Sequence, residues 1–474
     1  MPDPGPTSSS GARRSDAVAN VARILDAAEE LLRRRPHVSI GEIAQFAGVG
    51  RSTLYRHFET REALVEAVRR RARDHAEHDH APSLRPAGEL ANVAVTPLSV
   101  PDVLNKVAPF QLSEQIVAEA QRLDGIESAA LYVADLAGVV LRKLAGAPAF
   151  PDELRIHGTI GTEIPREAYG PIRAAVTARL PGAVVTPLML RGRAIGMLVV
   201  VGEENDSLRD LAQEAAVALA LADGYTDTLQ TARRARPTSP AAEIQQNLLP
   251  ARIHRLRGAT LAGNVLPGYD VGGDWFDVAD NADAVWLGVA DVEGSGVHAA
   301  GLAAVLLGAF RSARHQGEDP AGAAALMHEV LLATGPDITA TTTIGCWNAT
   351  TSVFRWVSTG SHGPLLAHAD GRVEELDPGV GPCLGSPELD PPFRLQQRRL
   401  DPGQRLVLLS DGGLESQDAS GVPFGRDGVA AALRATRGAT AAATVHAIEH
   451  AICVRIDEHL EDDVTTVVLA PHTH

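Results

Sequence analysis

Apolar residues recur at helical spacing near the start of the chain, and this pattern predicts a run of short helices. In "DAVANVARILDAAEELLRRR" (16–35) the apolar positions lie three and four residues apart, and Pro36 ends the pattern. Ser39 and Glu42 have the spacing of a capping box, so a second helix is expected over 40–47. The turn "GVG" and two further helical segments follow. The pattern therefore predicts an all-α unit at this end of the chain.

A second region, 105–225, mixes helices with strands. A helix is expected at "LSEQIVAEAQRL" (112–123), ahead of the strand-like "ESAALYVAD" (127–135). Two β-rich runs in "AVVTPLMLRGRAIGMLVVV" meet at Gly192 and predict a hairpin. A helix over 206–225 closes the region. This order of elements predicts an α/β unit of the size of a sensor domain.

The last region, 257–470, is rich in strands and contains two Ala-rich helices, at about 297–315 and 320–334. Its strands, such as "AVWLGVAD" and "RLVLLSD", are mostly apolar on both faces. Strands of this kind belong in buried sheets that helices cover. The region therefore predicts a layered α and β domain.

Breaks in these patterns divide the chain into six segments. A Pro-containing stretch with little periodicity separates the first two regions, and the polar "RRARPTSP" separates the second from the third. The expected segments are a disordered leader (1–15), an all-α domain (16–80), a linker (81–104), an α/β sensor-like domain (105–225), a connector (226–246) and a strand-rich domain (247–474).

The composition of the 474 residues, with 45% hydrophobic and 22% charged residues, is that of a soluble globular protein. No run of about 18 apolar residues occurs, so no membrane span is expected, and the first residues lack the apolar core of a secretory signal. The three cysteines (Cys346, Cys383 and Cys453) are widely spaced. This spacing fits a reducing cytoplasm and argues against a disulfide framework or a cysteine-based zinc site. We therefore expect a cytoplasmic protein.

Charge is spread unevenly along the chain. The net charge is −16, yet residues 1–75 carry 13 Arg against 10 Asp and Glu. An acidic protein with one mildly basic end is expected to meet nucleic acid, if at all, through that end.

Aspartates stand at the ends of apolar strands in the last region, next to glycine or another aspartate. These positions are Asp274, Asp291, Asp411, Asp462 and Asp463. A strand end fixes the position of a side chain, and glycine lets backbone and ligand approach closely. Carboxylates gathered at one place raise each other's pKa unless cations compensate them. An all-oxygen set favours two Mg²⁺ or Mn²⁺ ions, which could activate water and hold a phosphate group.

One aspartate beside a glycine is ordinarily only a turn, so the prediction depends on the joint pattern. Within "YDVGGDWFDV" (269–278), Asp270 and Asp277 are interpreted as structural or supporting residues. Trp275 and Phe276 are expected to pack behind the site.

Residues 241–470 resemble the SpoIIE-like branch of the PPM metal-dependent serine/threonine protein phosphatases. The motifs that carry this resemblance are "IQQNLLP", "VGGDWFDV", "ADVEGSGVHAA", "STGSHGPLLAH", "LLSDGGLES" and "DDVTTVVL". The resemblance implies an αββα sandwich with the metals at one edge of its two sheets. It also implies a metal site formed by Asp274, Asp291, Asp411, Asp462 and the Val292 carbonyl. Asp463 is expected among these ligands or beside them. Ala290 and Ser410 depart from the usual Gly and Thr, and neither change removes a carboxylate.

Residues 16–75 resemble the DNA-binding domain of the TetR family, most closely in "VSIGEIAQFAGVGRSTLYRHFETREALVEAV" (38–68). The resemblance implies that "GRSTLYRHF" enters the major groove of DNA. The implied DNA contacts are Arg51, Ser52, Thr53, Tyr55, His57 and Arg61. The alternative is a helical module that now serves dimerisation or contact with another protein.

Residues 105–225 resemble a GAF sensor domain, through "ESAALYVAD" and "TPLMLRGRAIGMLVV" (186–200). The family binds small molecules over its sheet and often dimerises through its terminal helices. The region has no Cys, which excludes a thioether-linked bilin, and His157 is its one His. We expect an unidentified small effector or none, and a homodimer.

Together the resemblances predict a cytoplasmic phosphatase that acts on phosphoserine or phosphothreonine. Its substrate would be a phosphorylated anti-sigma-factor antagonist, its control would come from the GAF-like domain, and its DNA-binding domain would localise it. The alternative is a TetR-like transcriptional regulator in which the phosphatase domain is chiefly regulatory.

Overall fold

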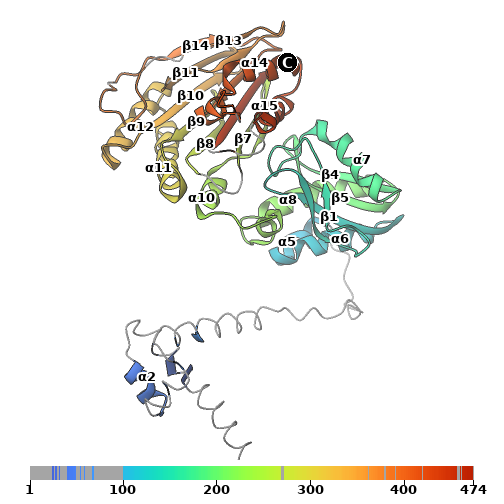
Figure 1. Cartoon of the computed structure of the whole chain (residues 1–474). Coiled ribbons are helices and arrows are strands. Elements are labelled where there is room, and N and C mark those ends of the chain that lie inside the picture. Colours follow the sequence, from blue (N-terminus) through green and yellow to red (C-terminus); the bar gives the residue numbers. More distant parts are fainter. Residues whose placement is uncertain are drawn as a thin grey trace, which may run out of the picture. The chain divides into compact units, whose positions relative to one another are not determined.

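The chain forms two compact units, Met1–Thr96 and Pro97–His474, in a computed structural model (Figure 1). The structure describes 100–267, 272–360, 362–377, 381–389, 391–418, 420–455, 460 and 462–472, together with 40–49 and ten further positions between 24 and 68. Each unit is treated by itself.

In the N-terminal unit, helix α2 (Ile40–Phe46) lies where the capping-box pattern predicts it. Its inward side chain Ile43 is fully buried, and so are Ile24, Leu54 and Leu64 from the neighbouring segments. These side chains form one small apolar core, as expected for helices that each have one apolar face. The predicted DNA contacts Arg51, Ser52, Thr53, Tyr55, His57 and Arg61 lie outside the described residues.

The first part of the larger unit is a five-stranded antiparallel sheet in the order β3-β2-β1-β5-β4. Its strands are β1 (Ile126–Ala134), β2 (Val140–Gly146), β3 (Glu153–Arg155), β4 (Ala183–Leu190) and β5 (Arg193–Gly202). The predicted hairpin is confirmed, since β4 and β5 pair and turn through Arg191 and Gly192, both with positive φ. A two-residue turn of this kind matches the twist of the strands it joins.

Helices cover both faces of this sheet. On one face α5 (Val100–Lys106), α6 (Leu112–Gln121) and α8 (Asp206–Ala222) pack on alternate residues of β1 such as Leu131. On the other face α7 (Tyr169–Arg179) packs on the intervening residues such as Tyr132. This alternation follows from the period of a strand. Helix α5 overlaps the end of the expected linker (81–104), because Leu104 packs into the apolar core on this face of the sheet.

The second part of the larger unit contains two antiparallel sheets. The first has the order β14-β11-β10-β9-β8, and the second has the order β13-β12-β15-β16-β7-β6. The strands are β6 (Ile253–Leu256), β7 (Ala259–Leu266), β8 (Asp274–Asp280), β9 (Val285–Val292), β10 (Ala340–Asn348), β11 (Val353–Thr359), β12 (Leu365–Ala367), β13 (Val373–Glu375), β14 (Gln396–Arg399), β15 (Arg405–Leu409) and β16 (Val464–Pro471).

The two sheets stack face to face, and helices cover their outer faces. Phe276, Trp347 and Leu408 belong to the apolar layer between the sheets. Helices α11 (Gly296–His315) and α12 (Pro320–Thr334) cover the first sheet, and α14 (Gly425–Ala435) and α15 (Ala441–Arg455) cover the second (Figure 1). The predicted αββα sandwich and its two Ala-rich helices are confirmed.

Helix α11 is long and apolar enough to cross a membrane by length and composition alone. Half of its most apolar window is buried, however, and residues such as Leu306 and Phe310 pack under the first sheet. This helix is explained by its place in the core of the sandwich.

Candidate metal centre

Two of the predicted carboxylates face each other across neighbouring strands. Asp274 begins β8, Asp291 stands near the end of β9, and the antiparallel register pairs the two residues directly. Asp274 is fully buried, and its Oδ2 accepts a hydrogen bond of 2.5 Å from Thr465 Oγ1 on β16. The register of one sheet and one contact to the other sheet therefore fix the position of Asp274.

Gly273 lets the backbone beside Asp274 approach β9 closely. A Cβ atom at Gly273 would lie only 2.8 Å from the Val292 carbonyl oxygen and 3.4 Å from Asp291 Oδ1. Any larger residue would push β9 away. The predicted Val292 carbonyl consequently lies beside the same two carboxylates.

A second glycine brings Asp411 to the site. Asp411 begins the short helix α13 (Asp411–Glu415), and its side chain contacts that of Asp291. A Cβ atom at Gly412 would lie 2.1 Å from the Asp463 carbonyl oxygen and 3.4 Å from Asp462 Cβ. The absence of a side chain at Gly412 is what allows α13 to lie against the segment before β16.

The two consecutive aspartates before β16 have different environments. Asp463 is buried, and its Oδ2 accepts hydrogen bonds from the backbone N–H groups of Gly273 (3.1 Å) and Asp274 (3.4 Å). Asp462 is exposed, and its Oδ1 accepts a bond from the Asp463 backbone N–H at 2.8 Å. One oxygen of Asp463 therefore holds the start of β8 in place.

Burial and mutual repulsion give these carboxyl groups strongly raised pKa values. Burial, followed by the Asp274 and Asp411 carboxyls, raises the pKa of Asp291 to about 12. Burial and then Asp463 raise the pKa of Asp274 well above its usual range. Burial also raises the pKa of Asp463 to about 6. Carboxyl groups in this environment hold protons unless positive charge is brought to them.

The residues present fit a hard divalent cation. Asp274 Oδ1 and Asp463 Oδ1 are buried and have no hydrogen-bond donor among the described residues. Among the described residues, no three His, Cys, Asp or Glu side chains are arranged around one position that an ion could occupy. Instead, the Asp291 carboxyl contacts the Asp274 and Asp411 carboxyls directly. An all-oxygen donor set with unsatisfied buried oxygens suits Mg²⁺ or Mn²⁺.

The other residues of the opening motif have structural roles, as the sequence suggested. Asp277 is 2% exposed and forms ion pairs with Arg311 and Arg314, both at 2.8 Å. Trp275 is fully buried and stacks on Phe310 with ring centroids 5.6 Å apart. Asp270 lies outside the described residues.

Sequence reasoning missed Gln245, on helix α10 (Pro240–Leu248). This side chain is 1% exposed, and its Nε2 donates to Asp463 Oδ2 at 2.6 Å and to the Asp274 carbonyl at 3.1 Å. The available signal was its spacing, because Gln245 lies on the same helical face as the buried Ala241 and Ala242. A polar residue on a buried helical face needs a hydrogen-bonding partner in the core.

His362 was also missed as an individual residue. It lines a small cavity together with Asp411, Ser410 and Thr359. Its Nδ1 lies 3.1 Å from the Arg426 guanidinium, and its buried Nε2 has no partner among the described residues. The sequence signal was the glycine-rich "STGSHGP" loop between two strands.

Comparisons with known protein families identify two domains. The family described as "Stage II sporulation protein E (SpoIIE)" matches residues 281–472, and "Bacterial regulatory proteins, tetR family" matches residues 24–68. The chain therefore carries a SpoIIE-type phosphatase domain at its C-terminal end and a TetR-type helix-turn-helix domain at its N-terminal end. The SpoIIE match contains Asp291, Asp411 and Asp462, whereas Asp274 precedes it.

Two curated relatives, both HTH-type transcriptional regulators, match a short part of the chain. The uncharacterized HTH-type transcriptional regulator Rv1255c of Mycobacterium tuberculosis is 55% identical over 58 residues, which are 12% of this chain and 28% of that protein. The HTH-type transcriptional repressor LfrR of Mycolicibacterium smegmatis is 42% identical over 69 residues, 15% of this chain and 34% of the repressor. The chain thus spans about a third or less of the length of these relatives.

Solved structures similar to this chain are distant in sequence. The SiaA-PP2C domain of Pseudomonas aeruginosa is 20% identical with a TM-score of 0.43, and the match covers 49% of this chain and 94% of that one. The PP2C phosphatase domain of Bacillus subtilis SpoIIE with a fragment of its regulatory domain is 13% identical with a TM-score of 0.39, covering 76% and 88%. Similarity at this level supports no argument about function.

Proposed function

We propose that this chain, which joins a TetR-type domain to a SpoIIE-type phosphatase domain, is a Mn²⁺- or Mg²⁺-dependent phosphatase of phosphoserine and phosphothreonine proteins. The observation that carries the proposal is the direct pairing of Asp274 with Asp291, together with the contact between Asp291 and Asp411. Three buried or half-buried carboxyls with no basic residue among them need an external positive charge.

The proposed chemistry is hydrolysis by water, without a covalent enzyme intermediate. Two divalent ions, when bound, would lower the pKa of a water molecule and offset the charge of the phosphate group. Asp274, Asp291, Asp411 and Asp462, with the Val292 carbonyl, are the proposed ligands. Because Thr465 already donates to Asp274 Oδ2, the Asp274 oxygen without a donor is Oδ1.

Two further residues position these ligands. Asp463 Oδ2 accepts hydrogen bonds from the backbone N–H groups of Gly273 and Asp274 and from the Gln245 side-chain amide. All of these bonds end on Oδ2, and Oδ1 has no hydrogen-bond donor among the described residues. Asp463 is therefore proposed both to orient β8 and to offer Oδ1 to the metal site.

A turnover assay with an aryl phosphate tests the proposal. Turnover is expected to require Mn²⁺ or Mg²⁺ and to fall by about a hundredfold or more in Asp411→Asn. The matched control is Asp427→Asn, which removes an exposed carboxylate from the first turn of α14. Metal-independent turnover, or equal loss in both variants, would contradict the assignment.

The proposed substrate is a phosphorylated anti-sigma-factor antagonist, by resemblance to the SpoIIE family. We propose a cytoplasmic location and a homodimer on the same basis. The expected result is that the full chain releases phosphate from such a phosphoprotein and that Asp411→Asn does not. A phosphoprotein left intact by a chain that hydrolyses aryl phosphates would exclude this substrate and retain the enzyme.

A second candidate function, transcriptional regulation through DNA, is favoured by the TetR-family match over 24–68. Arg51, Ser52, Thr53, Tyr55, His57 and Arg61 are the proposed contacts. Sequence-specific binding to DNA that is lost in Arg51→Ala and Tyr55→Phe would support it. Specific DNA binding without any metal-dependent turnover would favour the regulator as the main function.

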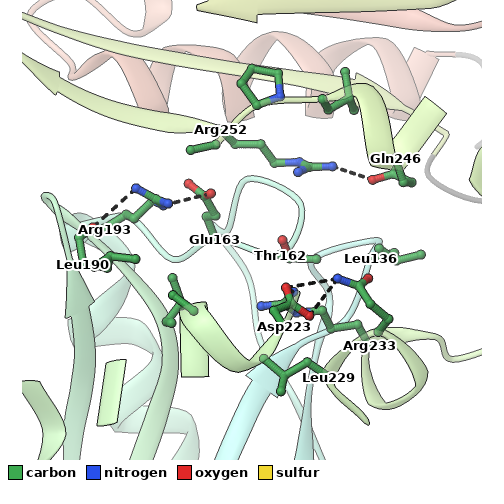
Figure 2. Close-up of a pocket in the computed structure, with 16 residues that line it drawn as sticks. Leu136, Thr162, Glu163, Leu190, Arg193, Asp223, Leu229, Arg233, Gln246 and Arg252 are labelled. Atoms are coloured by element: carbon green, nitrogen blue, oxygen red, sulfur yellow. Dashed lines mark hydrogen bonds and ion pairs between the residues drawn. The ribbon is translucent and has the colours of Figure 1, made fainter. Parts of the chain in front are cut away.

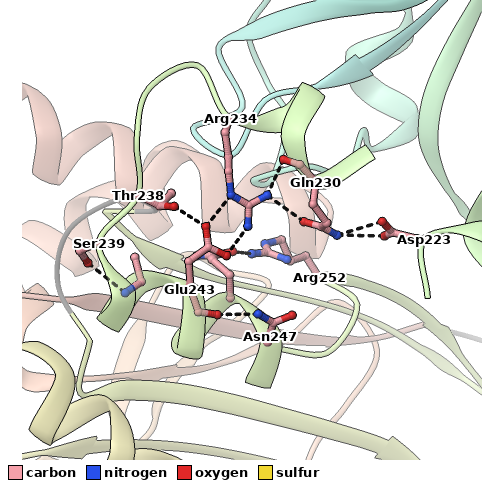
Figure 3. A network of polar contacts seen from close by, with 10 residues as sticks. Asp223, Gln230, Arg234, Thr238, Ser239, Glu243, Asn247 and Arg252 are labelled. Carbon is pink, nitrogen blue, oxygen red and sulfur yellow. Dashed lines mark hydrogen bonds and ion pairs between the residues drawn. The ribbon is translucent and has the colours of Figure 1, made fainter. Parts of the chain in front are cut away.

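We also propose that the sensor-like domain controls the metal site through the connector. Arg234, at the end of α9 (Thr228–Arg233), binds Glu243 through both Nε and a terminal nitrogen and also contacts Gln230 (Figure 3). Glu243 lies on α10, the helix whose Gln245 binds Asp463. A shift in the sensor-like domain can therefore reach the carboxylates through this one helix.

A further inference from the structure

A cavity of about 270 Å³ lies where the sensor-like domain meets the connector and the start of β6 (Figure 2). Its walls come from β4, β5, α8, α9, α10 and the segments around them. The apolar part of the lining includes Leu136, Leu229 and Leu249, and the polar part includes three arginines. Apolar walls with a few convergent polar groups are typical of small-molecule sites.

Two of the arginines have carboxylate partners within the lining. Arg193 Nε lies 2.9 Å from Glu163 Oε1, and an Arg233 terminal nitrogen lies 3.2 Å from Asp223 Oδ2. Arg233 is 8% exposed, and its buried Nε has no hydrogen-bond partner among the described residues. One donor in the lining therefore remains available.

The third arginine, Arg252, lacks a carboxylate partner within ion-pair distance among the described residues. It is 8% exposed and donates only to neutral oxygens, Gln246 Oε1 at 2.5 Å and Asn264 Oδ1 at 3.1 Å. Burial is the main influence on this group and lowers its pKa. A buried guanidinium whose hydrogen-bond partners are neutral is costly, because water has been removed and the carboxyls that attract it, Glu163 and Glu449, lie beyond ion-pair distance.

The charges of the lining therefore favour an anion. Three arginines and two carboxylates, Glu163 and Asp223, line the cavity, so the lining itself has an excess of one positive formal charge. The cavity volume of about 270 Å³ exceeds what a few ordered water molecules need and leaves room for a small ligand.

We propose that this cavity binds a small organic anion, with its carboxylate or phosphate group held by Arg252 and Arg233 and its apolar part against Leu229 and Leu249. Arginine is suited to this role, because its planar guanidinium group can donate two parallel hydrogen bonds to a carboxylate or to a phosphate. The site differs from a pocket over the sheet of the sensor-like domain, because its lining includes the connector and the residues just before β6.

The position of the cavity gives the ligand a route to the metal centre. Gln246 lines the cavity, and its neighbour Gln245 binds Asp463. A ligand that pairs with Arg252 competes with Gln246 for the same guanidinium and thereby acts on α10. This regulatory consequence rests on the proposed phosphatase function, whereas binding of the anion does not.

Calorimetric titration of the full chain tests the proposal independently of catalysis. The protein is stripped of divalent cations on a chelating resin and titrated with succinate and with inorganic phosphate at constant ionic strength. Saturable binding of one probe in the millimolar range or tighter is expected. Succinate alone would indicate a carboxylate ligand, and phosphate alone a phosphate ligand. Binding of neither probe would overturn the proposal.

Variants locate the binding. Arg252→Gln and Arg233→Gln are each expected to lower the affinity for the probe by about tenfold or more. The matched control is Arg255→Gln, which changes an exposed arginine on β6. Ala220→Leu narrows the cavity from α8 and keeps every charge, so it replaces any arginine variant that fails to fold. Binding that survives in Ala220→Leu and both arginine variants would place the anion elsewhere and overturn the proposal.

Discussion

Gln245 and Asp463 lie 218 positions apart in the chain, yet a 2.6 Å hydrogen bond joins the Gln245 side-chain amide to Asp463 Oδ2. The same amide nitrogen donates to the Asp274 carbonyl at 3.1 Å. One side chain of α10 therefore contacts both the carboxylate that orients β8 and the strand end that carries Asp274.

Gln245→Leu tests this contact. Leucine has a similar volume but leaves Asp463 Oδ2 with only its backbone donors. The free energy of unfolding should therefore fall by about 1–3 kcal/mol. Metal-dependent turnover is expected to fall at the same time. Asn247→Leu, on the exposed side of α10, is the control for both urea unfolding and turnover. Equal behaviour of the two variants would mean that Gln245 does not position the site.

Asp277→Asn should destabilise the fold and leave metal binding intact. The change removes the charge that pairs with Arg311 and Arg314, and the cost of breaking a buried ion pair is roughly 3 kcal/mol. Denaturant unfolding and manganese titration measure the two effects separately. Asp280→Asn, at the exposed end of the same strand, should change neither quantity. A loss of manganese affinity in Asp277→Asn would assign Asp277 to the metal site instead.

Glu449 makes stability depend on pH. Burial raises the pKa of this carboxyl from 4.5 to about 8, while Asn264 and Arg252 oppose the shift. The folded state holds the Glu449 proton more tightly than the unfolded chain does. The stabilisation that comes from protonated Glu449 is therefore complete below about pH 4.5. It is lost as the pH rises through about 8.

Urea unfolding at several pH values between these limits measures the effect. The free energy of unfolding should fall by a few kcal/mol over the range in the wild type, and this fall should be reduced in Glu449→Gln. Glu203→Gln changes an exposed carboxylate and should retain the wild-type profile. An unchanged profile in Glu449→Gln would show that this carboxyl titrates normally.

Glu243→Gln should loosen helix α10. The Arg234 guanidinium beside it is the main reason that the pKa of Glu243 is lowered, and both side chains are partly exposed. The stabilisation lost is therefore modest, about 1 kcal/mol or less. Hydrogen exchange of the amides in 240–248 should become faster, while exchange in α12 stays unchanged. Equal exchange of α10 in both proteins would remove the Arg234–Glu243 pair from the proposed route.

The elements with a clear period were predictable from the sequence. The hairpin turning at Gly192 and the helices α11 and α12 appear as expected, because alternation, turn chemistry and helical spacing are local properties. The strand-end pattern indicates the carboxylates and the resemblance implies the αββα arrangement and the ligand set, but periodicity alone does not pair Asp274 with Asp291.

Contacts between distant segments could not be predicted. The sequence does not reveal that Gln245 reaches Asp463, or that Arg252 lacks a carboxylate partner, since both depend on how separate domains pack. The cavity has the same origin, because its lining combines residues from 136 to 252. The part of helix α5 within 100–104 has too few apolar residues to show a helical period, and its Leu104 is stabilised by packing against a core that the local sequence does not reveal.

The central claim is that Asp274, Asp291 and Asp411 bind divalent cations. Diffraction from crystals grown with manganese, recorded at a wavelength where manganese scatters anomalously, tests this claim most directly. We expect anomalous peaks between these carboxylates, with the direct contact of Asp291 to Asp411 replaced by contacts to the ions. Crystals without such a peak, in which the carboxyl groups still touch one another, would contradict it.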